Sequence, residues 1–422
     1  MNRLIKKIIP NFLVGFYHFL LSFCAAIFYG FPSRNIKIIG ITGTKGKTTV
    51  VTLAGKILEE AGFKVGWISS GTIKVGDKEW LNPYHMTMPG RTLTQKFLSQ
   101  MVSAKCQHAL IEVTSEGILQ SRHKFIDFDT VVFTNLAPEH IEAHGGFEKY
   151  REAKGRLFKT TEATHVINLD NENSGYFLKF PAKRKIGFTM GSKTVPDIEV
   201  VNASDFSENS GGISFRVDST EFDLKLFGRF NAANALCAIC VAISRGISLE
   251  ICKAGLERVS GIPGRVESID EGQNFKVIVD LAHTPGSFEE IFKLAKSLPH
   301  DKIISVFGSA GGGRDKWKRP ELGKIAAKYS DEIILTNEDC YDEDPLKILS
   351  EIKEGVIKTD FQTQNLYEII DRKEAIKKAF RLARENDIVL LLGKGTEQIM
   401  DIGFKKIHWD EREVAREELK LL

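Results

Sequence analysis

The feature that most constrains this chain is a glycine-rich loop between an apolar run and a helical pattern. The loop is Gly40–Thr49, the apolar run is Ile36–Ile39, and the helical pattern runs from Val50 to Ala61. Glycines let backbone N–H groups turn inward around an anion, and the following helix presents its positive end to the same anion. Lys47 would reach the outer phosphates and the Thr48 hydroxyl would bind Mg²⁺. The order therefore predicts a nucleoside triphosphate site, with a plain strand-to-helix turn as the alternative.

Apolar, β-branched runs alternate with helical patterns after this loop, at Val65–Ser69, Ala109–Val113, Thr130–Phe133 and Thr164–Leu169. This alternation predicts an α/β fold with a mostly parallel sheet covered by helices. Between Lys185 and Leu226 the apolar runs are short and are separated by Asp, Asn, Ser and Gly. They predict a small antiparallel subsheet of hairpins.

A chain of 422 residues is too long for one ordinary core. The segment Ser260–Gly264 has the composition of a linker, and strand and helix patterns alternate again beyond it, with strands expected at Val277–Asp280, Ile303–Phe307, Glu332–Leu335 and Ile388–Leu392. We therefore predict three parts: an apolar N-terminal segment of residues 1–34, a nucleotide-binding domain of residues 35–262, and a second α/β domain of residues 263–422.

The N-terminal segment is almost wholly apolar from Phe12 to Phe31 and follows the basic residues Arg3, Lys6 and Lys7. It is long enough for a membrane span, but a span would place its basic end outside. A cleavable signal peptide is disfavoured because the small pair Ala25-Ala26 lies inside the apolar run. Two interpretations stay open, a helix on the membrane surface and a helix packed on the protein.

Charge and cysteines exclude some classes of protein. The net charge of +3 arises from balanced acids and bases and gives no reason to expect a nucleic-acid partner. Cys237 and Cys240 form a C-x-x-C pair, but no second pair or histidine stands at zinc spacing. We expect core cysteines in a reduced, cytoplasmic protein, with contact to the inner face of the membrane through residues 12–31 left open.

Several polar residues stand at predicted strand ends. Glu112 interrupts a buried strand, where an acid is costly unless it meets a cation, and His140 follows another strand. The carboxyl ends of parallel strands meet at one edge, so the loop, Glu112 and His140 should converge. Taken singly, each has a plainer interpretation, as a surface acid or a capping histidine, and the pattern around Lys154 is that of a solvated helix face. Arg265 could stabilise phosphate charge across the domain junction.

Taken together, the motifs resemble those of the Mur ligases of peptidoglycan assembly, most closely the group that makes UDP-N-acetylmuramoyl-tripeptides. The resemblance begins near Ile36 and extends through both domains. It rests on the glycine loop and on the motifs Glu112–Ser115, Thr134–His140, Tyr150–Lys154, Gly228–Asn231, Pro263–Arg265, Asp280–Pro285, Gly308–Pro320 and Gly393–Glu397.

This resemblance implies a P-loop central domain, a Rossmann-like C-terminal domain and an ATP- and Mg²⁺-dependent ligase that works as a monomer on small molecules. The γ-phosphate passes to a substrate carboxylate, and an incoming amino acid attacks the acyl phosphate. The implied ATP-binding residues are Gly43, Thr44, Gly46, Lys47, Thr48, Thr49, Asn231, Asn234, Arg265, Asp280 and His283. The implied catalytic residues are Lys47, Glu112, His140, Lys154 and Arg265; the implied metal ligands are Thr48, Glu112, His140 and, if carbamylated, Lys154. The implied substrate-binding residues are Thr87, Pro89, Ser115, Arg122, Arg314, Asp339, Tyr341, Gly393 and Glu397.

Two departures from the family pattern bear on the substrates. The apolar segment stands where the family has a uridine-binding domain, which leaves open a lipid-linked substrate or a partner that supplies the missing grip. The family's Asp-Asn-Pro-Arg motif is replaced by Glu338–Tyr341. Tyr341 offers no charge to the distal carboxylate of diaminopimelate and Asp339 favours a cation, so we predict a diamino acid such as lysine. Glu397 could bind the incoming amine.

Two alternatives remain. One is a ligase of the same family that acts on a folate, lipid-linked or other glutamyl substrate. The other is a membrane-associated nucleotide-binding scaffold that has lost ligation; the joint retention of Lys47, Glu112, His140 and Lys154 argues against it, since a scaffold needs only the first.

Overall fold

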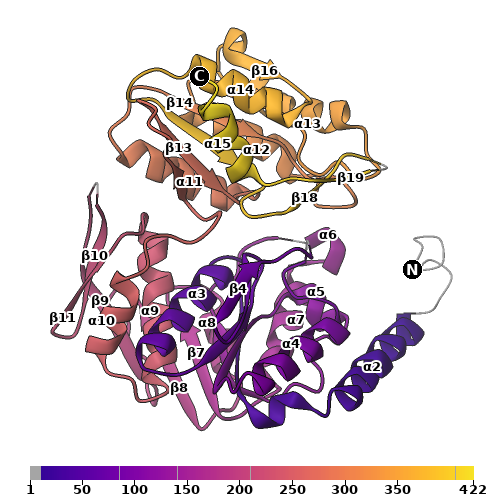
Figure 1. Ribbon diagram of the computed structural model, residues 1–422, viewed down its shortest axis with the longest axis vertical. Helices are drawn as coiled ribbons and strands as arrows, with labels where there is room; N and C mark the ends of the chain where they lie inside the picture. The colour runs from indigo at the N-terminus through magenta and orange to yellow at the C-terminus, as the bar shows by residue number, and fades with distance from the viewer. Residues whose placement is uncertain (1–10, 85, 140, 210, 404) are drawn as a thin grey trace.

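Two sheets organise the chain, as the computed structural model shows for residues 11–84, 86–139, 141–209, 211–403 and 405–422. The first sheet has eleven strands within residues 37–224, and the second has six strands within residues 267–392. Figure 1 places the second unit above the first, with the segment between α10 (Leu249–Glu257) and β12 (Glu267–Ile269) crossing from one to the other.

The first sheet is built around β1 (Lys37–Thr42), which pairs in parallel with β5 (His108–Glu112) on one side and β6 (Phe128–Phe133) on the other. Its side chains alternate between two cores, with Ile39 and Ile41 in one and Ile38 in the other. The sheet order is β11-β10-β9-β8-β7-β6-β1-β5-β2-β3-β4. The remaining strands are β2 (Val65–Ile68), β3 (Thr72–Val75), β4 (Lys78–Leu81), β7 (Thr164–Asn168), β8 (Arg184–Thr189), β9 (Glu199–Asn209), β10 (Gly212–Val217) and β11 (Thr220–Leu224).

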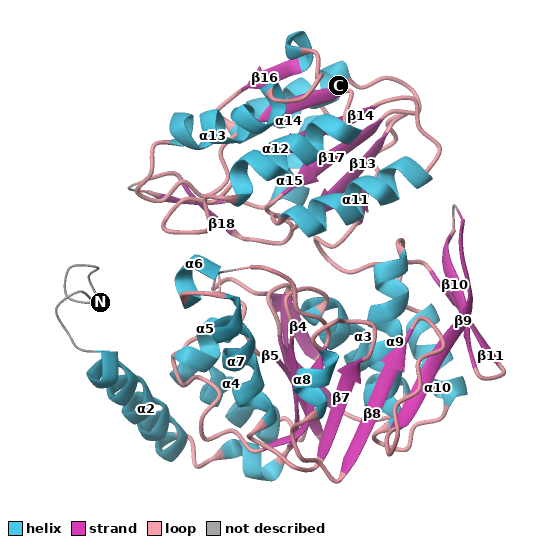
Figure 2. Cartoon of the chain, turned by 180° about the vertical axis from the view of Figure 1, so that it is seen from behind, coloured by secondary structure: helices cyan, strands magenta, loops and turns pink. Residues whose placement is uncertain are grey.

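Helices cover both faces of this sheet (Figure 2). One core includes residues of α3 (Lys47–Glu60), α9 (Arg229–Ile243) and α10 (Leu249–Glu257). The other includes residues of α4 (Arg91–Ser103), α5 (Ser115–Leu119), α7 (Phe147–Phe158) and α8 (Ser174–Leu178). The short helix α6 (Ile141–His144) precedes α7. Cys237 and Cys240 are buried in α9, as the sequence predicts.

The expected hairpins between Lys185 and Leu226 are present as β9, β10 and β11, which pair antiparallel. They are not a separate subsheet, because β9 also pairs in parallel with β8. Phe215 and Phe222 face each other across the last hairpin with ring centroids 5.2 Å apart. This aromatic pair gives the hairpin a buried face and fixes its register.

The second sheet has the order β12-β13-β17-β14-β15-β16. Its centre is β17 (Ile388–Leu392), fully buried, which pairs in parallel with β13 (Lys276–Asp280) and β14 (Ile303–Phe307). The other strands are β12 (Glu267–Ile269), β15 (Glu332–Leu335) and β16 (Leu366–Glu368), with a separate pair β18 (Ile399–Asp401) and β19 (Lys406–His408). One face packs on α11 (Pro285–Ser297), α12 (Lys318–Tyr329) and α13 (Pro345–Ile357), and the other on α14 (Arg372–Leu382) and α15 (Glu411–Leu419).

The N-terminal helix α2 (Asn11–Phe28) lies on the outside of the first unit, next to α4 (Figures 1 and 2). It is packed on the protein, as one of the two open interpretations predicts, and the basic residues Arg3, Lys6 and Lys7 lie outside the described residues. Within the described ranges no helix combines the length and the apolarity needed to cross a bilayer.

Candidate active site

The glycine loop connects the end of β1 to the start of α3, as the sequence predicts. Gly46 has a φ of +80°, and a Cβ there would clash with the side chain of Asn234, so only glycine fits. The Lys47 ammonium donates to the carbonyl oxygens of Gly43 at 3.1 Å and Thr44 at 2.9 Å. It also lies 3.8 Å from a carboxylate oxygen of Glu112. The loop thus brings a cation to the mouth of the buried strand β5.

Three oxygen-bearing side chains converge beside this lysine. The Thr48 hydroxyl donates to Glu112 Oε2 at 2.9 Å, and Ser70 Oγ lies 2.6 Å from Thr48 Oγ1 and donates to the same carboxylate oxygen at 3.1 Å. Glu112 is only 2% exposed. Oxygen donors of this kind suit Mg²⁺, and a phosphate-bound Mg²⁺ needs few ligands from the protein.

The further imidazole expected at this place, His140, lies outside the described residues. Among the side chains that the structure describes, no group of three or more His, Cys, Asp or Glu is arranged to hold a metal ion. The fit for Mg²⁺ therefore rests on hydroxyl and carboxylate oxygens of Thr48, Ser70 and Glu112. Ser70 was not singled out in the sequence, although its place just after β2 is where polar residues of such sheets gather.

Lys154 lies inside the protein, so the prediction of a solvated helix face, which rests on its charged sequence neighbours, is wrong. It is 2% exposed and its ammonium donates to the Gly43 carbonyl oxygen at 2.7 Å. It shares the inward side of α7 with Tyr150, Ala153 and Leu157, which are buried as well. Burial lowers the pKa of Lys154 well below its ordinary value, and the positive charge of Lys47 lowers it further.

The second unit reaches the same place through Arg265. The φ of Gly264 is +59° and a Cβ there would clash with the backbone of Thr396, so the chain can turn here only with glycine. The Arg265 guanidinium donates to the hydroxyl oxygens of Thr48 at 3.1 Å and Ser70 at 3.3 Å. A cation from the second unit therefore lies on the oxygens that we assign to Mg²⁺.

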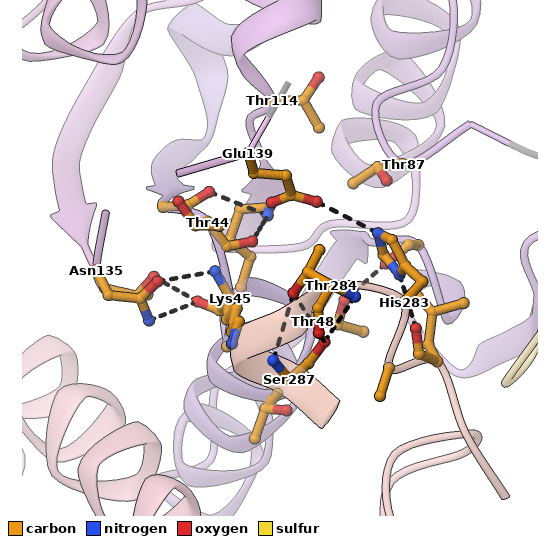
Figure 3. Close-up of a pocket in the computed structure, with 18 of the residues that line it drawn as sticks. Thr44, Lys45, Thr48, Thr87, Thr114, Asn135, Glu139, His283, Thr284 and Ser287 are labelled. Atoms are coloured by element: carbon orange, nitrogen blue, oxygen red, sulfur yellow. Dashed lines mark hydrogen bonds and ion pairs between the residues drawn. The ribbon is translucent and has the colours of Figure 1, made fainter. Parts of the chain in front are cut away.

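Asp280 and His283 lie at the carboxyl end of β13. The Asp280 carboxylate accepts from the backbone N–H groups of Val266 at 2.8 Å and Ala282 at 2.6 Å, and burial raises its pKa. His283 Nε2 lies 3.3 Å from Glu139 Oε1, a contact between the units that Figure 3 shows as a dashed line.

The asparagine pair at the start of α9 adds a polar wall on the side of Gly46. Asn234 Nδ2 donates to Asn231 Oδ1 at 3.2 Å, and Asn231 Nδ2 donates to the Phe227 carbonyl oxygen at 2.8 Å. Both asparagines are buried.

A second buried lysine organises the far end of the site. The Lys394 ammonium donates to Asp339 Oδ2 at 2.9 Å, to Glu397 Oε2 at 2.7 Å and to the Ile399 carbonyl oxygen at 2.9 Å. The Asp339 carboxylate also accepts from the backbone N–H of Asp401 at 2.7 Å. Asp339, which the sequence analysis expects to favour a cation, is thus already paired with the Lys394 ammonium, which it shares with Glu397.

One cavity of about 490 Å³ between the two units connects these groups. The predicted residues that line it are Gly43, Thr44, Gly46, Lys47, Thr48, Thr49, Thr87, Glu112, Ser115, Arg122, Lys154, Asn231, Asn234, Arg265, Asp280, His283, Arg314, Asp339, Tyr341, Gly393 and Glu397. Pro89 is not among the lining residues; its carbonyl oxygen accepts from Thr94 Oγ1 at 3.1 Å.

Further lining residues were not predicted from the sequence, among them Lys45, Ser70, Glu139, Lys318 and Glu338. Lys318 is buried, donates to the His283 carbonyl oxygen at 2.9 Å, and has a pKa lowered by burial. Glu338 is buried too, and burial raises its pKa. Lys318 lies in the motif Gly308–Pro320, which carried the resemblance, and membership of that motif was the signal that could have found it; Glu338 lies in the segment that departs from the family pattern.

Comparison with known proteins finds matching families and related sequences. The Mur ligase middle-domain family matches residues 41–242, and the family described as Mur ligase, glutamate ligase domain matches residues 264–395. A UDP-N-acetylmuramyl-tripeptide synthetase of Roseiflexus sp. (strain RS-1) is 38% identical over 414 residues, which cover 94% of this chain and 81% of that protein. A UDP-N-acetylmuramoyl-L-alanyl-D-glutamate--2,6-diaminopimelate ligase of Geobacillus kaustophilus (strain HTA426) is 36% identical, over 98% of this chain and 84% of its own.

Solved structures of related ligases align with most of this chain. The structure of a UDP-N-acetylmuramoyl-L-alanyl-D-glutamate--2,6-diaminopimelate ligase aligns with a TM-score of 0.61 at 28% identity, over 92% of this chain and 78% of that one. A folylpolyglutamate synthase of Mycobacterium tuberculosis, solved with ADP and AMPPCP, aligns with a TM-score of 0.67 over 88% of this chain and 91% of its own. At 15% identity the latter shares only the fold.

Proposed function

This chain belongs to the Mur ligase family and is an ATP-dependent ligase of peptidoglycan precursor synthesis, and we propose that it adds a diamino acid, with lysine preferred, to a muramoyl-dipeptide. The observation that carries the proposal is the single cavity in which the phosphate loop, Arg265 and the Lys394 cluster meet. The cavity would hold the phosphates of ATP, the carboxylate of the muramoyl-dipeptide and the amine of the incoming amino acid close together.

We assign the phosphate end to the first unit. Lys47 and the loop amides would hold the phosphates of ATP, and Thr48, Ser70 and Glu112, with His140, would hold Mg²⁺. The metal, when bound, neutralises phosphate charge. Arg265 and His283 would close over the nucleotide from the second unit, with Asn231 and Asn234 on the adenine side and Asp280 fixing the turn that carries Arg265.

A free carboxylate is a poor acyl donor because oxide would have to leave. Transfer of the γ-phosphoryl group gives it phosphate as a leaving group, so positioning and charge neutralisation are the tasks of the protein. Lys154 fits this need in an unusual way. Its lowered pKa favours the neutral amine that carbamylation requires, and the product would place an anion beside the metal site.

The acceptor would lie along Thr87, Ser115 and Arg122, with Pro89 shaping the turn. Ser115 Oγ lies 3.1 Å from His144 Nε2, which holds the hydroxyl at the start of α5. The Arg122 guanidinium donates to Gln120 Oε1 at 2.8 Å and to the Met88 carbonyl oxygen, so it is positioned at the cavity wall. A cation fixed there suits an anionic group of the acceptor.

The amino acid would bind between Arg314, Tyr341, Gly393 and the Lys394 cluster. The side chains of Tyr341 and Arg314 hydrogen-bond each other, and the carboxylates of Asp339 and Glu397 bring negative charge to the Lys394 cluster. That charge favours an ammonium group, and Tyr341 offers no cation to a distal carboxylate. These features support lysine over the diaminopimelate named for several relatives.

Phosphate release tests this proposal. Purified protein with ATP, Mg²⁺ and UDP-muramoyl-dipeptide should release phosphate faster with lysine than with diaminopimelate. Tyr341→Arg should raise the ratio of kcat/KM for diaminopimelate over lysine about tenfold. Tyr367→Arg, on the remote strand β16, is the matched control. Faster release with diaminopimelate in the unaltered chain would refute the preference for lysine.

We propose further that the protein is a cytoplasmic monomer that touches the inner face of the membrane, divided at residues 1–34, 35–262 and 263–422. A scaffold that binds ATP without ligation is the alternative function. ATP turnover that does not respond to any amino acid would favour it.

A further inference from the structure

The helix α2 is amphipathic in the reverse sense to a normal surface helix. Its fully buried side chains are small or polar, namely Ser22, Ala25 and Ala26, and the Ser22 hydroxyl lies 2.8 Å from the Ser121 carbonyl oxygen. Phe19 and Phe23 contact the ring of Phe125. Other large apolar side chains point outward, namely Leu13, Phe16, Tyr17, Leu20, Ile27 and Phe28, each at least 45% exposed. A surface helix of a globular protein normally shows the opposite arrangement. An uncharged, aromatic face of this length indicates a binding surface.

The inward side of α2 contacts an arginine next to the acceptor site. His18 Nδ1 lies 2.6 Å from Arg91 Nη2, and Arg91 is the first residue of α4. Arg91 also donates to the Gln120 carbonyl oxygen at 3.4 Å, while Arg122 donates to the side chain of the same glutamine at 2.8 Å. The two guanidinium groups are therefore neighbours, one under α2 and one on the cavity wall.

Neither arginine has an acidic partner among the residues that the structure describes. Their hydrogen bonds go to carbonyl oxygens, Gln120 and His18, and the Nε–H group of each is buried without an acceptor. Glu116 lies near Arg122 without forming an ion pair. Half-buried arginines normally pair with carboxylates or phosphates, so two of them side by side form a site for a doubly charged anion.

The distribution of charged residues in the sequence indicates what the outward face of α2 binds. No Asp or Glu occurs before Glu59, and Arg3, Lys6 and Lys7 precede the helix in the sequence. Basic residues beside a helix with a Phe- and Leu-rich face are typical of helices that lie in the interface of an anionic bilayer. A protein partner would need neither the basic run nor the absence of acids.

We propose that α2 lies in an anionic membrane surface and that Arg91 and Arg122 bind the diphosphate of a lipid-linked muramoyl-peptide acceptor. This inference rests on the proposed ligase function and names its acceptor class. The diphosphate would lie where α2 meets the cavity wall, with the lipid in the bilayer beside α2 and the muramoyl-peptide in the cavity. The arginine pair would then hold the diphosphate at the junction of the membrane surface and the cavity.

Vesicle binding tests the membrane part. The full chain should sediment with vesicles of equal parts phosphatidylglycerol and phosphatidylcholine. The double variant Phe16→Ser, Leu20→Ser should lose at least about tenfold in binding, because two apolar side chains no longer leave water. Ile357→Ser, which removes an exposed apolar side chain from α13, is the matched control. An unchanged melting temperature checks the folding of each variant. Equal binding by the double variant and the unaltered chain would overturn the role of α2.

Three acceptors with the same muramoyl-dipeptide test the diphosphate part: the undecaprenyl diphosphate, the UDP conjugate and the methyl glycoside, which has no diphosphate. Phosphate release should show the lowest KM with the undecaprenyl diphosphate. Arg91→Gln should reduce the KM preference for this acceptor over the methyl glycoside about tenfold. Arg184→Gln, on the remote strand β8, is the control.

The outcomes separate the two proposals. Equal KM values for all three acceptors, with Arg91→Gln unchanged in preference, would overturn the inference while the ligase function stands. A lower KM for the UDP conjugate than for the undecaprenyl diphosphate would refute the assignment of a lipid-linked acceptor. Release with none of the acceptors and any amino acid would instead refute the ligase function.

Discussion

Two buried lysines beside the active-site cavity, Lys154 in the first half of the chain and Lys394 in the second, have opposite surroundings. Lys154 meets one carbonyl oxygen and the positive Lys47, and its pKa is lowered. Lys394 lies between Asp339 and Glu397, and although burial opposes its charge these carboxylates raise its pKa. Burial is nearly the same, so the neighbours decide the charge. The surroundings of Lys154 favour the neutral amine, and those of Lys394 favour the cation.

The largest expected effect tests the chemical half of this comparison. Lys154→Arg should lower kcat about a thousandfold, because an arginine keeps its charge and cannot be carbamylated. The measurement is phosphate release with saturating substrates. Lys149→Arg, on the exposed side of the same helix, is the control. Full activity of Lys154→Arg would show that a cation suffices at this position.

The next effect tests the structural half. Lys394→Met should lower the free energy of unfolding by about 3 kcal/mol, because it leaves Asp339 buried without its cation, while the partly exposed Glu397 can turn to water. Urea unfolding followed by tryptophan fluorescence measures the change. Lys347→Met, on the surface of α13, should change it by less than about 0.5 kcal/mol. A loss as small as that of the control would mean that Lys394 is not essential to the fold.

The pH dependence of stability should have a different sign for the two lysines. The folded pKa of Lys154 lies below the ordinary value of 10.5, so between these two pKa values the unfolded chain binds more protons and stability rises with pH. The rise is at most about 1.4 kcal/mol per pH unit and should vanish in Lys154→Met. The contribution of Lys394, whose pKa is raised, is complete below 10.5 and is lost as the pH rises above that value.

Urea unfolding in bicarbonate-free buffer at several pH values from about 8 to 10 separates the two cases. The difference in stability between the unaltered chain and Lys154→Met should change with pH. The corresponding difference for Lys394→Met should stay flat in this range. Two flat differences would contradict the assigned pKa shift of Lys154.

The smallest expected effect concerns Glu139, whose charge bears on the pKa of Lys154. The carboxylate of Glu139 raises the pKa of Lys154 against the effect of burial. Glu139→Gln should therefore shift the rise of ligase activity with pH toward lower pH, and should change stability by less than about 1 kcal/mol through the partly buried contact with His283. Asp77→Asn, a remote surface change, should leave the profile in place. A shift toward higher pH would contradict this assignment of charge.

Much of the fold follows from local pattern. The alternation of apolar runs and helical patterns correctly predicted β2, β5 to β7, β13 to β15 and β17, because strands buried on both faces are continuous apolar runs. The hairpin β3–β4 was missed, since its strands have four residues each and β4 is largely exposed. The pairing of β9 with β8 was missed as well, because register between distant segments leaves no local signal.

The candidate site divides in the same way. The glycine loop and Glu112 were found because their pattern carries a physical reason. The burial of Lys154 was not, since its helix presents other charges around it and only the tertiary structure shows which side faces inward. Asp339 was found as a residue but not as a partner, because Lys394 lies 55 positions away along the chain.

The central place of β17 in the second sheet has a consequence for biosynthesis. During translation β13 and β14 leave the ribosome long before β17, yet they are joined only through it. Until β17 emerges, the nascent chain presents two unpaired strand edges rich in valine and isoleucine, whereas β1, β5 and β6 of the first sheet are already complete. The second half should therefore be the part of the newborn protein that depends on chaperones.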